Sequence, residues 1–123
     1  MKIMIVDDEQ DVEILFRQQF RKEVRDGIVE LCYAFSGEAA LSYLDRQNPP
    51  DVVYILSDIN MPGITGIELL KTVKQKYPQI RVSMITAYGD EHNFNTAMST
   101  GAENYFTKPI DFTHIKRQVL NVA

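Results

Sequence analysis

The sequence predicts an α/β protein in which helices cover both faces of a parallel β-sheet. Short runs of aliphatic and β-branched residues alternate five times with longer segments of helical periodicity. The strongest apolar runs are nearly continuous in Ile, Val, Leu and Met, which is typical of strands buried on both faces of a parallel sheet. In such a sheet, ligands bind beyond the C-terminal ends of the strands, so this edge is where we expect a site.

Five segments have the composition of strands, and a helical segment separates each from the next. The predicted strands are Lys2–Val6, Ile28–Ala34, Val52–Ser57, Ile80–Thr86 and Asn104–Thr107. Their alternation with helices predicts parallel strands joined by right-handed crossovers. Five such units suit a doubly wound (βα)5 sandwich of three layers, with the flavodoxin-like strand order 2-1-3-4-5.

Apolar residues spaced three or four positions apart identify five helices. The stripes are Val12, Leu15, Phe16 and Phe20; Ala39, Ala40, Leu41 and Leu44; Ile67, Leu70, Val73 and Tyr77; Phe94, Ala97 and Met98; and Phe112, Ile115 and Val119. Proline disfavours helical geometry in the residue before it, so Pro49 and Pro78 should end the second and third helices. Gly101 should end the fourth, because glycine accepts the left-handed conformation of a helix C-terminus.

Length and composition restrict the class of protein. The 123 residues fit one domain, which we expect to extend over residues 1–123. The formal net charge of −4 argues against direct binding of nucleic acid. No apolar run approaches the ~20 residues that cross a bilayer, so we expect no membrane contact. Cys32 is the only cysteine, which excludes an internal disulfide and fits a cytoplasmic protein.

Polar, chemically competent residues follow four of the predicted strands. Asp7 and Asp8 follow the first strand, Asp58 the third, Thr86 ends the fourth and Lys108 follows the fifth. Because the C-terminal ends of parallel strands share one edge of the sheet, these side chains should converge. The simpler interpretation, in which "LSDINMPG" around Asp58 only forms a turn, rests on the turn preference of Asp, Asn, Pro and Gly. The convergence of all five residues favours a functional site.

The chemistry of this cluster points to magnesium and phosphate. Three neighbouring carboxylates raise one another's proton affinity and stay ionised only beside positive charge. Mg²⁺ accepts one or two carboxylates and keeps several waters, and Lys108 would add a second positive charge. A carboxylate held in this way can attack phosphorus and form an aspartyl phosphate. Phosphoryl transfer also needs donors around the phosphoryl oxygens, a role that the Thr86 hydroxyl could fill.

In these motifs the chain resembles the receiver domain of two-component response regulators. The resemblance covers essentially the whole chain and rests on "VDDE", "SDINMPGITG", "ITA" and "YFTKP" in this order and spacing. It implies that Asp58 is the phosphoacceptor. It also implies that Asp7, Asp8, Asp58 and the backbone carbonyl of Asn60 bind Mg²⁺, with Asp7 acting largely through water. A role for Asp7 or Asp11 in capping the first helix is the competing interpretation.

The same resemblance implies a conformational switch. Thr86 would turn toward the phosphoryl group, Lys108 would form an ion pair with it, and the Lys108–Pro109 peptide bond would be cis. Tyr105 would then pack inward and change the face formed by the fourth helix, fifth strand and fifth helix. The alternative for Tyr105 is a half-buried ring at a sheet edge with its hydroxyl in water. Tyr88, two residues beyond Thr86, is expected to slow self-dephosphorylation by obstructing water.

The resemblance implies a signalling module that accepts phosphate and loses it again, and not a turnover enzyme. The expected partners are a sensor histidine kinase or a histidine phosphotransfer protein, and an output domain or downstream protein. A homodimer formed on phosphorylation is also compatible with the resemblance.

Two other functions compete with this interpretation. A phosphohydrolase of the haloacid dehalogenase type would have a second Asp two residues after the nucleophile, where this chain has Asn60, and would place its motif on the first strand. A receiver that only docks, without phosphorylation, would not need the complete acidic site.

Overall fold

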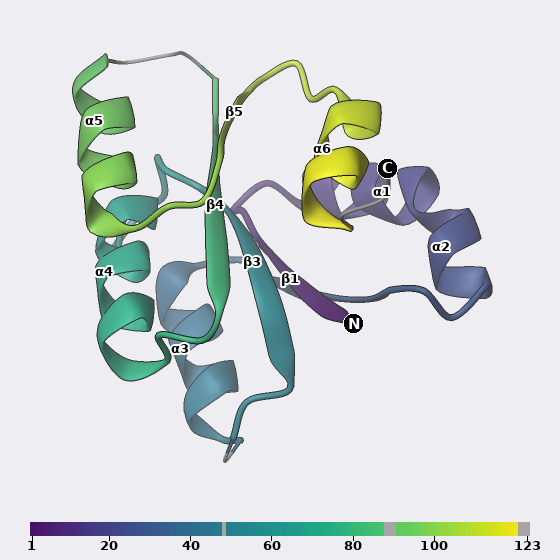
Figure 1. Cartoon of the computed structure of the whole chain (residues 1–123), viewed down its shortest axis with the longest axis horizontal. Helices are drawn as coiled ribbons and strands as arrows, with labels where there is room; N and C mark the ends of the chain where they lie inside the picture. The colour runs from purple at the N-terminus through teal and green to yellow at the C-terminus, as the bar shows by residue number, and fades with distance from the viewer. Residues whose placement is uncertain (48, 88–90, 121–123) are drawn as a thin grey trace.

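The computed structural model describes residues 1–47, 49–87 and 91–120. One sheet holds five parallel strands in the order β2-β1-β3-β4-β5, as predicted (Figure 1). The strands are β1 (Lys2–Val6), β2 (Glu30–Ala34), β3 (Val52–Asp58), β4 (Arg81–Thr86) and β5 (Tyr105–Thr107). Each lies within one residue or two of its predicted bounds, and β3 extends to include Asp58.

The described residues form six helical segments, where five were predicted; the first five lie between strands and the last follows β5. They are α1 (Gln10–Gln19), α2 (Arg21–Arg25), α3 (Gly37–Asp45), α4 (Gly66–Lys76), α5 (Glu91–Thr100) and α6 (Phe112–Val119). The first predicted helix is divided because the backbone leaves helical geometry at Phe20, with φ −102° and ψ 11°. The Phe20 side chain is fully buried, and its ring stacks on Phe16 at 5.7 Å between centroids.

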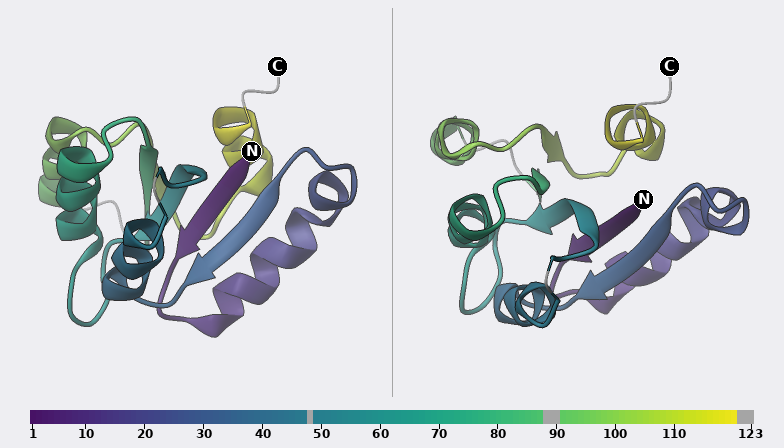
Figure 2. Two further views of the ribbon diagram at one scale, coloured as in Figure 1. Left: turned by 90° about the horizontal axis from the view of Figure 1, so that it is seen from below. Right: turned by 60° about the horizontal axis from the view of Figure 1, so that its bottom comes forward.

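The helices form two layers around the sheet. Figure 2 shows α1, α2 and α6 on one side and α3, α4 and α5 on the other. Successive side chains of a strand point to opposite faces, so Ile3 and Met4 of β1 belong to different apolar cores, each fully or almost fully buried. This burial on both faces explains why β1, β3 and β4 consist of nearly continuous apolar residues. None of the helices in the described ranges is long and apolar enough to cross a membrane.

The predicted apolar stripe of α5 is only partly buried, which corrects the sequence interpretation. Ala97 is buried, but Phe94 and Met98 are 38% and 39% exposed. The helix packs near β5, which has only three residues and forms the edge of the sheet. The apolar stripe of α5 is therefore wider than the sheet surface that could cover it. Leu15 of α1 is likewise exposed. Gly101 ends α5 as predicted, with φ +115° and its N–H donating to the Ala97 carbonyl at 3.2 Å.

Candidate functional site

Asp58 is the last residue of β3 and is held there by its immediate neighbours. Only 7% of the residue is exposed. Its Oδ1 accepts a hydrogen bond from the Ile59 N–H at 2.9 Å, and its backbone carbonyl accepts one from the buried Ser57 hydroxyl at 2.8 Å. The carboxylate therefore has a defined orientation at the C-terminal edge of the sheet.

The loop after Asp58 closes tightly against the end of β3. The N–H of Gly66, the first residue of α4, donates to the Ile59 carbonyl at 2.9 Å. A Cβ on Gly66 would lie 2.8 Å from Ile59 Cα and would overlap with the Asp58 carbonyl oxygen. Glycine is therefore required by close approach of two backbone segments. Thr65 and Glu68 begin α4 with a reciprocal capping box, which sets where the loop ends.

Three carboxylates meet at this edge. One oxygen from each of Asp7, Asp8 and Asp58 lies within 4.8 Å of the other two. Asp7 and Asp8 follow β1, which is the neighbour of β3, and the last residue of β1, Val6, pairs with Ser57. Asp7 is 6% exposed, whereas Asp8 is exposed. The predicted convergence of the carboxylates at the switch point of the strand order is present.

The surroundings raise the pKa of Asp58 to about 6. Burial has the largest effect, and the nearby Asp7 carboxylate adds to it, with a smaller contribution from Asp8. The Lys108 ammonium and the Ile59 N–H act in the opposite direction. The protonated form of Asp58 is therefore favoured, mainly because a buried carboxylate is costly to ionise. Three convergent carboxylates, two of them on buried residues, fit a hard divalent cation such as Mg²⁺.

Lys108 supplies the positive side chain of the site, and its ion pair is with Asp7. Its Nζ lies 3.5 Å from Asp7 Oδ2, across a sequence separation of 101 residues. The lysine is anchored through its backbone, since its N–H donates to the Thr86 carbonyl at 2.7 Å. The Lys108–Pro109 bond is cis, as the resemblance implied. The ammonium thus stands at the rim of the acidic cluster without an ion pair to Asp58.

Thr86 and Tyr105 lie at different positions along the strand direction. Thr86, which is 2% exposed, is the last residue of β4 and pairs with Thr107, whereas Tyr105 pairs with Met84 two residues further back. The Tyr105 ring is half-buried against the α3–α4–α5 core, and its centroid is 5.4 Å from that of Phe94. Thr86 is therefore at the edge that carries the carboxylates, and Tyr105 lies behind it.

The helix-capping alternative for Asp7 and Asp11 is wrong. Glu9 is the N-cap of α1 and makes no side-chain cap, while Asp7 Oδ1 accepts a hydrogen bond from the Glu9 N–H at 2.9 Å. Asn60 is exposed two residues after Asp58. Tyr88 lies outside the described residues, so its expected influence on water is not addressed by the structure.

Three features of the site were missed at the level of sequence: the Ser57 hydroxyl that supports the Asp58 carbonyl, the Ile59 N–H that orients the carboxylate, and the Phe94 ring beside Tyr105. A serine within an otherwise apolar strand is a visible signal for the first. The other two depend on how the loop and α5 pack.

Comparison with known proteins agrees with this geometry. Residues 3–120 match the sequence profile of the response regulator receiver domain. The chain is 35% identical over 118 residues to sporulation initiation phosphotransferase F of Bacillus subtilis (strain 168), covering 96% of this chain and 90% of that protein.

Solved structures give the same result for the fold. A receiver domain protein from Clostridium thermocellum superposes with a TM-score of 0.84 at 24% identity, covering 98% of this chain and 90% of that one. The response regulator TrrA from Thermotoga maritima, solved in complex with Mg²⁺ and BeF, has a TM-score of 0.80 at 26% identity, covering 98% of this chain and 96% of that one. The chain belongs to the response regulator receiver domain family of two-component signalling.

Proposed function

We propose that Asp58 accepts a phosphoryl group from a histidine kinase or a histidine phosphotransfer protein, and that residues 1–123 act as a single receiver domain. The observation that carries the proposal is the cluster of Asp7, Asp8 and Asp58 oxygens within 4.8 Å, with the Lys108 ammonium at its rim. The family match over residues 3–120 supports the extent of the domain.

The residues present fit a magnesium ion. Asp7, Asp8, Asp58 and the backbone carbonyl of Asn60 would hold it, since all four offer the oxygen ligands that Mg²⁺ prefers. When bound, the ion would neutralise negative charge on the phosphoryl group and on the carboxylates. Its role is also supported by the TrrA structure, which contains Mg²⁺ with a beryllium fluoride.

The orientation of Asp58 suggests which atom reacts. The Ile59 N–H holds Oδ1, so we assign the attack on phosphorus to Oδ2. A bond forms between this oxygen and the phosphorus of a phosphohistidine, while the bond from phosphorus to the imidazole nitrogen breaks and the nitrogen keeps the electron pair. Lys108 and the Thr86 hydroxyl would then donate to the phosphoryl oxygens, where positive charge and hydrogen bonds matter most.

A shift of Thr86 toward the phosphoryl group would alter the packing around Tyr105. Tyr105 already contacts Phe94 of α5, so movement of either ring would reach the surface of α5, β5 and α6. We propose that this face controls an output domain or a downstream protein, and that a phosphorylation-dependent homodimer would use the same face. Hydrolysis of the aspartyl phosphate would reset the protein, which acts as a signalling module without substrate turnover.

Labelling with acetyl phosphate tests the proposal. The wild-type chain should gain one phosphoryl group in the presence of Mg²⁺, as measured by intact mass spectrometry, and Asp58→Asn should gain none. Asp26→Asn is the matched control, because Asp26 is an exposed aspartate outside the acidic cluster. Phosphate retained on Asp58→Asn would contradict the assignment of the acceptor. Steady turnover of a phosphate monoester would instead favour the phosphohydrolase alternative.

A further inference from the structure

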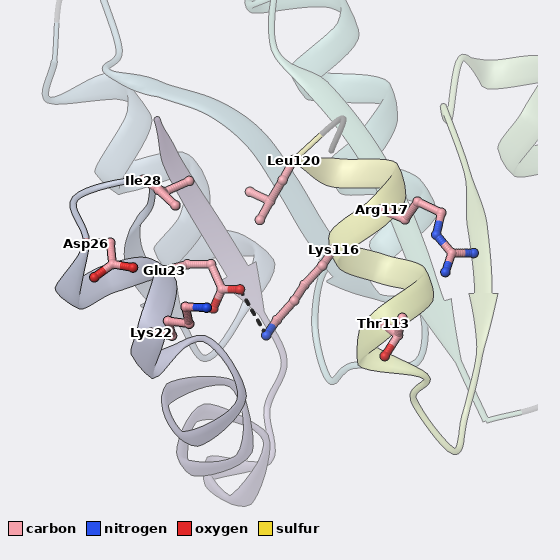
Figure 3. A pocket seen from close by; sticks show the side chains of 8 residues that line it. All are labelled: Lys22, Glu23, Asp26, Ile28, Thr113, Lys116, Arg117 and Leu120. Carbon is pink, nitrogen blue, oxygen red and sulfur yellow. Dashed lines mark ion pairs between the residues drawn. The ribbon is translucent and has the colours of Figure 1, made fainter. Parts of the chain in front are cut away.

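A groove lies between α2 and α6, away from the acidic cluster. It has a volume of about 350 Å³ and is lined by Lys22, Glu23, Asp26, Ile28, Thr113, Lys116, Arg117 and Leu120 (Figure 3). Thr113, Lys116 and Arg117 of α6 and its C-cap residue Leu120 are spaced at i, i+3, i+4 and i+7, so they lie on one face over two turns. Ile28 precedes β2 and Leu120 follows α6, which places the apolar end of the groove near the edge where the strands begin.

An ion pair forms the floor of this groove. Lys116 extends from α6 toward α2, and its Nζ lies 3.2 Å from Glu23 Oε2, as Figure 3 shows. The same ammonium lies 5.2 Å from the centroid of the buried Phe20 ring, which favours its position electrostatically. The floor is therefore fixed by contacts on both helices, and the groove is a feature of the folded chain.

The charged residues of the groove leave two cations without an ion-pair partner in the described part of the chain, in a protein that is acidic as a whole. The groove itself is lined by three basic residues, Lys22, Lys116 and Arg117, and two acidic residues, Glu23 and Asp26, whereas the whole chain has 13 basic and 17 acidic residues. Glu23 is paired with Lys116, and Asp26 with Arg25 at 3.4 Å. Neither Lys22 nor Arg117 forms an ion pair with any of the residues that the structure describes. Lys22 on the α2 side and Arg117, whose side chain extends along the side of α6 away from α2 in Figure 3, are thus the cations available to a partner.

We propose that this groove binds an acidic amphipathic helix of a partner protein. A groove between two helices, about two turns long, is the shape that accepts a third helix through its apolar face. Aliphatic side chains of the partner would pack between Ile28, which is 50% exposed, and Leu120. Carboxylates flanking that stripe would approach Lys22 and Arg117, and opposite charges of this kind set orientation and specificity. The interaction does not depend on phosphorylation of Asp58.

Peptide display against the folded Asp58→Asn variant tests this proposal. The library should contain peptides of about 15 residues, long enough to form a helix on binding. We expect enrichment of sequences with Leu or Ile three and four positions apart, flanked by Asp and Glu. An enriched peptide, synthesised with a fluorophore, should bind about tenfold more weakly to the double variant Lys22→Glu/Arg117→Glu, by anisotropy. Ile28→Ser should also weaken binding.

Matched controls separate groove binding from general charge attraction. Arg46→Glu/Lys71→Glu makes the same change in net charge at exposed positions outside the groove, and Ile14→Ser removes an equally exposed aliphatic residue from α1. Both should leave the affinity within about twofold. Thermal melts verify that all variants fold. We expect them to fold because the substituted residues are exposed.

Several outcomes would overturn the proposal. The first is the absence of any enriched acidic amphipathic sequence, and the second is an equal loss of affinity in the control variants. The third is self-association of the wild-type chain that Lys22→Glu/Arg117→Glu abolishes, because a second copy of the chain would then be the occupant. Binding of a nucleic acid oligomer or an anionic vesicle at the groove in place of the peptide would also count against it. Because the assay uses Asp58→Asn, failure of the phosphoacceptor assignment leaves its result unaffected.

Discussion

Lys108 Nζ lies 3.5 Å from Asp7 Oδ2, so the amine of the site pairs with the metal-ligand candidate and not with the phosphoacceptor candidate Asp58. This arrangement compensates the buried Asp7 carboxylate and influences Asp58 only through space.

Replacement of Lys108 should raise the pKa of Asp58 above its value of about 6, because the ammonium lowers that pKa in the native site. A carboxyl-carbon NMR titration of Lys108→Ala in metal-free buffer measures this. Lys108→Arg keeps the charge and is the control. Labelling of Lys108→Ala by acetyl phosphate should persist, since Asp58 remains. An unchanged Asp58 titration would show that the two groups are not coupled.

Removal of the Asp58 charge should stabilise the metal-free fold at neutral pH. The pKa of Asp58 is raised from 3.8 to about 6, so the folded state binds the proton more tightly than the unfolded state. The contribution of this group to stability is therefore full below about pH 4 and is lost as pH rises through about 6. Asp58→Asn should add about 1–3 kcal/mol to the free energy of unfolding near pH 7.5.

Urea denaturation with a chelator present, repeated at several pH values, measures that gain. It should shrink toward zero at about pH 3, below the unfolded-state pKa of 3.8, where Asp58 is protonated in both states. Asp26→Asn, at an exposed position, should show no comparable pH dependence. A gain that is equal at all pH values would mean that packing, and not charge, is responsible.

Magnesium should stabilise the wild-type chain through the acidic cluster. Binding to the folded state alone adds about 2.7 kcal/mol when the free ion is at about 100 times its Kd. Asp8→Asn should weaken Mg²⁺ binding about tenfold or more in calorimetric titrations, because it removes one of three convergent carboxylates. Asp11→Asn, an exposed aspartate in the first turn of α1, should leave the affinity unchanged. Equal losses in both variants would point to general electrostatics.

Gly66→Ala should destabilise the fold by about 2 kcal/mol or more, because the new methyl group overlaps with the Asp58 carbonyl and forces the loop away from β3. It should also slow labelling of Asp58. Gly27→Ala is an informative comparison, since Gly27 has φ +74° and nothing within 4 Å of a Cβ. Gly27→Ala should lower the free energy of unfolding by only about 1 kcal/mol, the cost of the left-handed backbone conformation for alanine, and should leave the labelling of Asp58 unchanged. Thermal denaturation and the labelling rate distinguish the two.

The strand pattern and the location of the site were predictable from the chain alone. Nearly continuous apolar runs separated by helical stripes predict a parallel sheet, and in a parallel sheet the C-terminal strand ends must share one edge. Asp7, Asp8 and Asp58 therefore meet because the strand order, which the sequence pattern predicts, places the ends of their strands side by side. The end of α5 at Gly101 was equally readable, because glycine at a helix C-terminus is a local signal.

The remaining features depend on contacts between distant segments. Which apolar residues of α5 are buried depends on the width of the sheet beneath it, so Phe94 and Met98 could not be distinguished from Ala97 by periodicity. The pairing of Lys108 with Asp7 joins residues 101 positions apart, and the groove exists only because α6 packs beside α2. The sequence by itself determined the order of the elements and the edge that carries the chemistry. Tertiary packing decided the distances and exposures, because these arise from side chains that meet only after the sheet and its two helical layers have assembled.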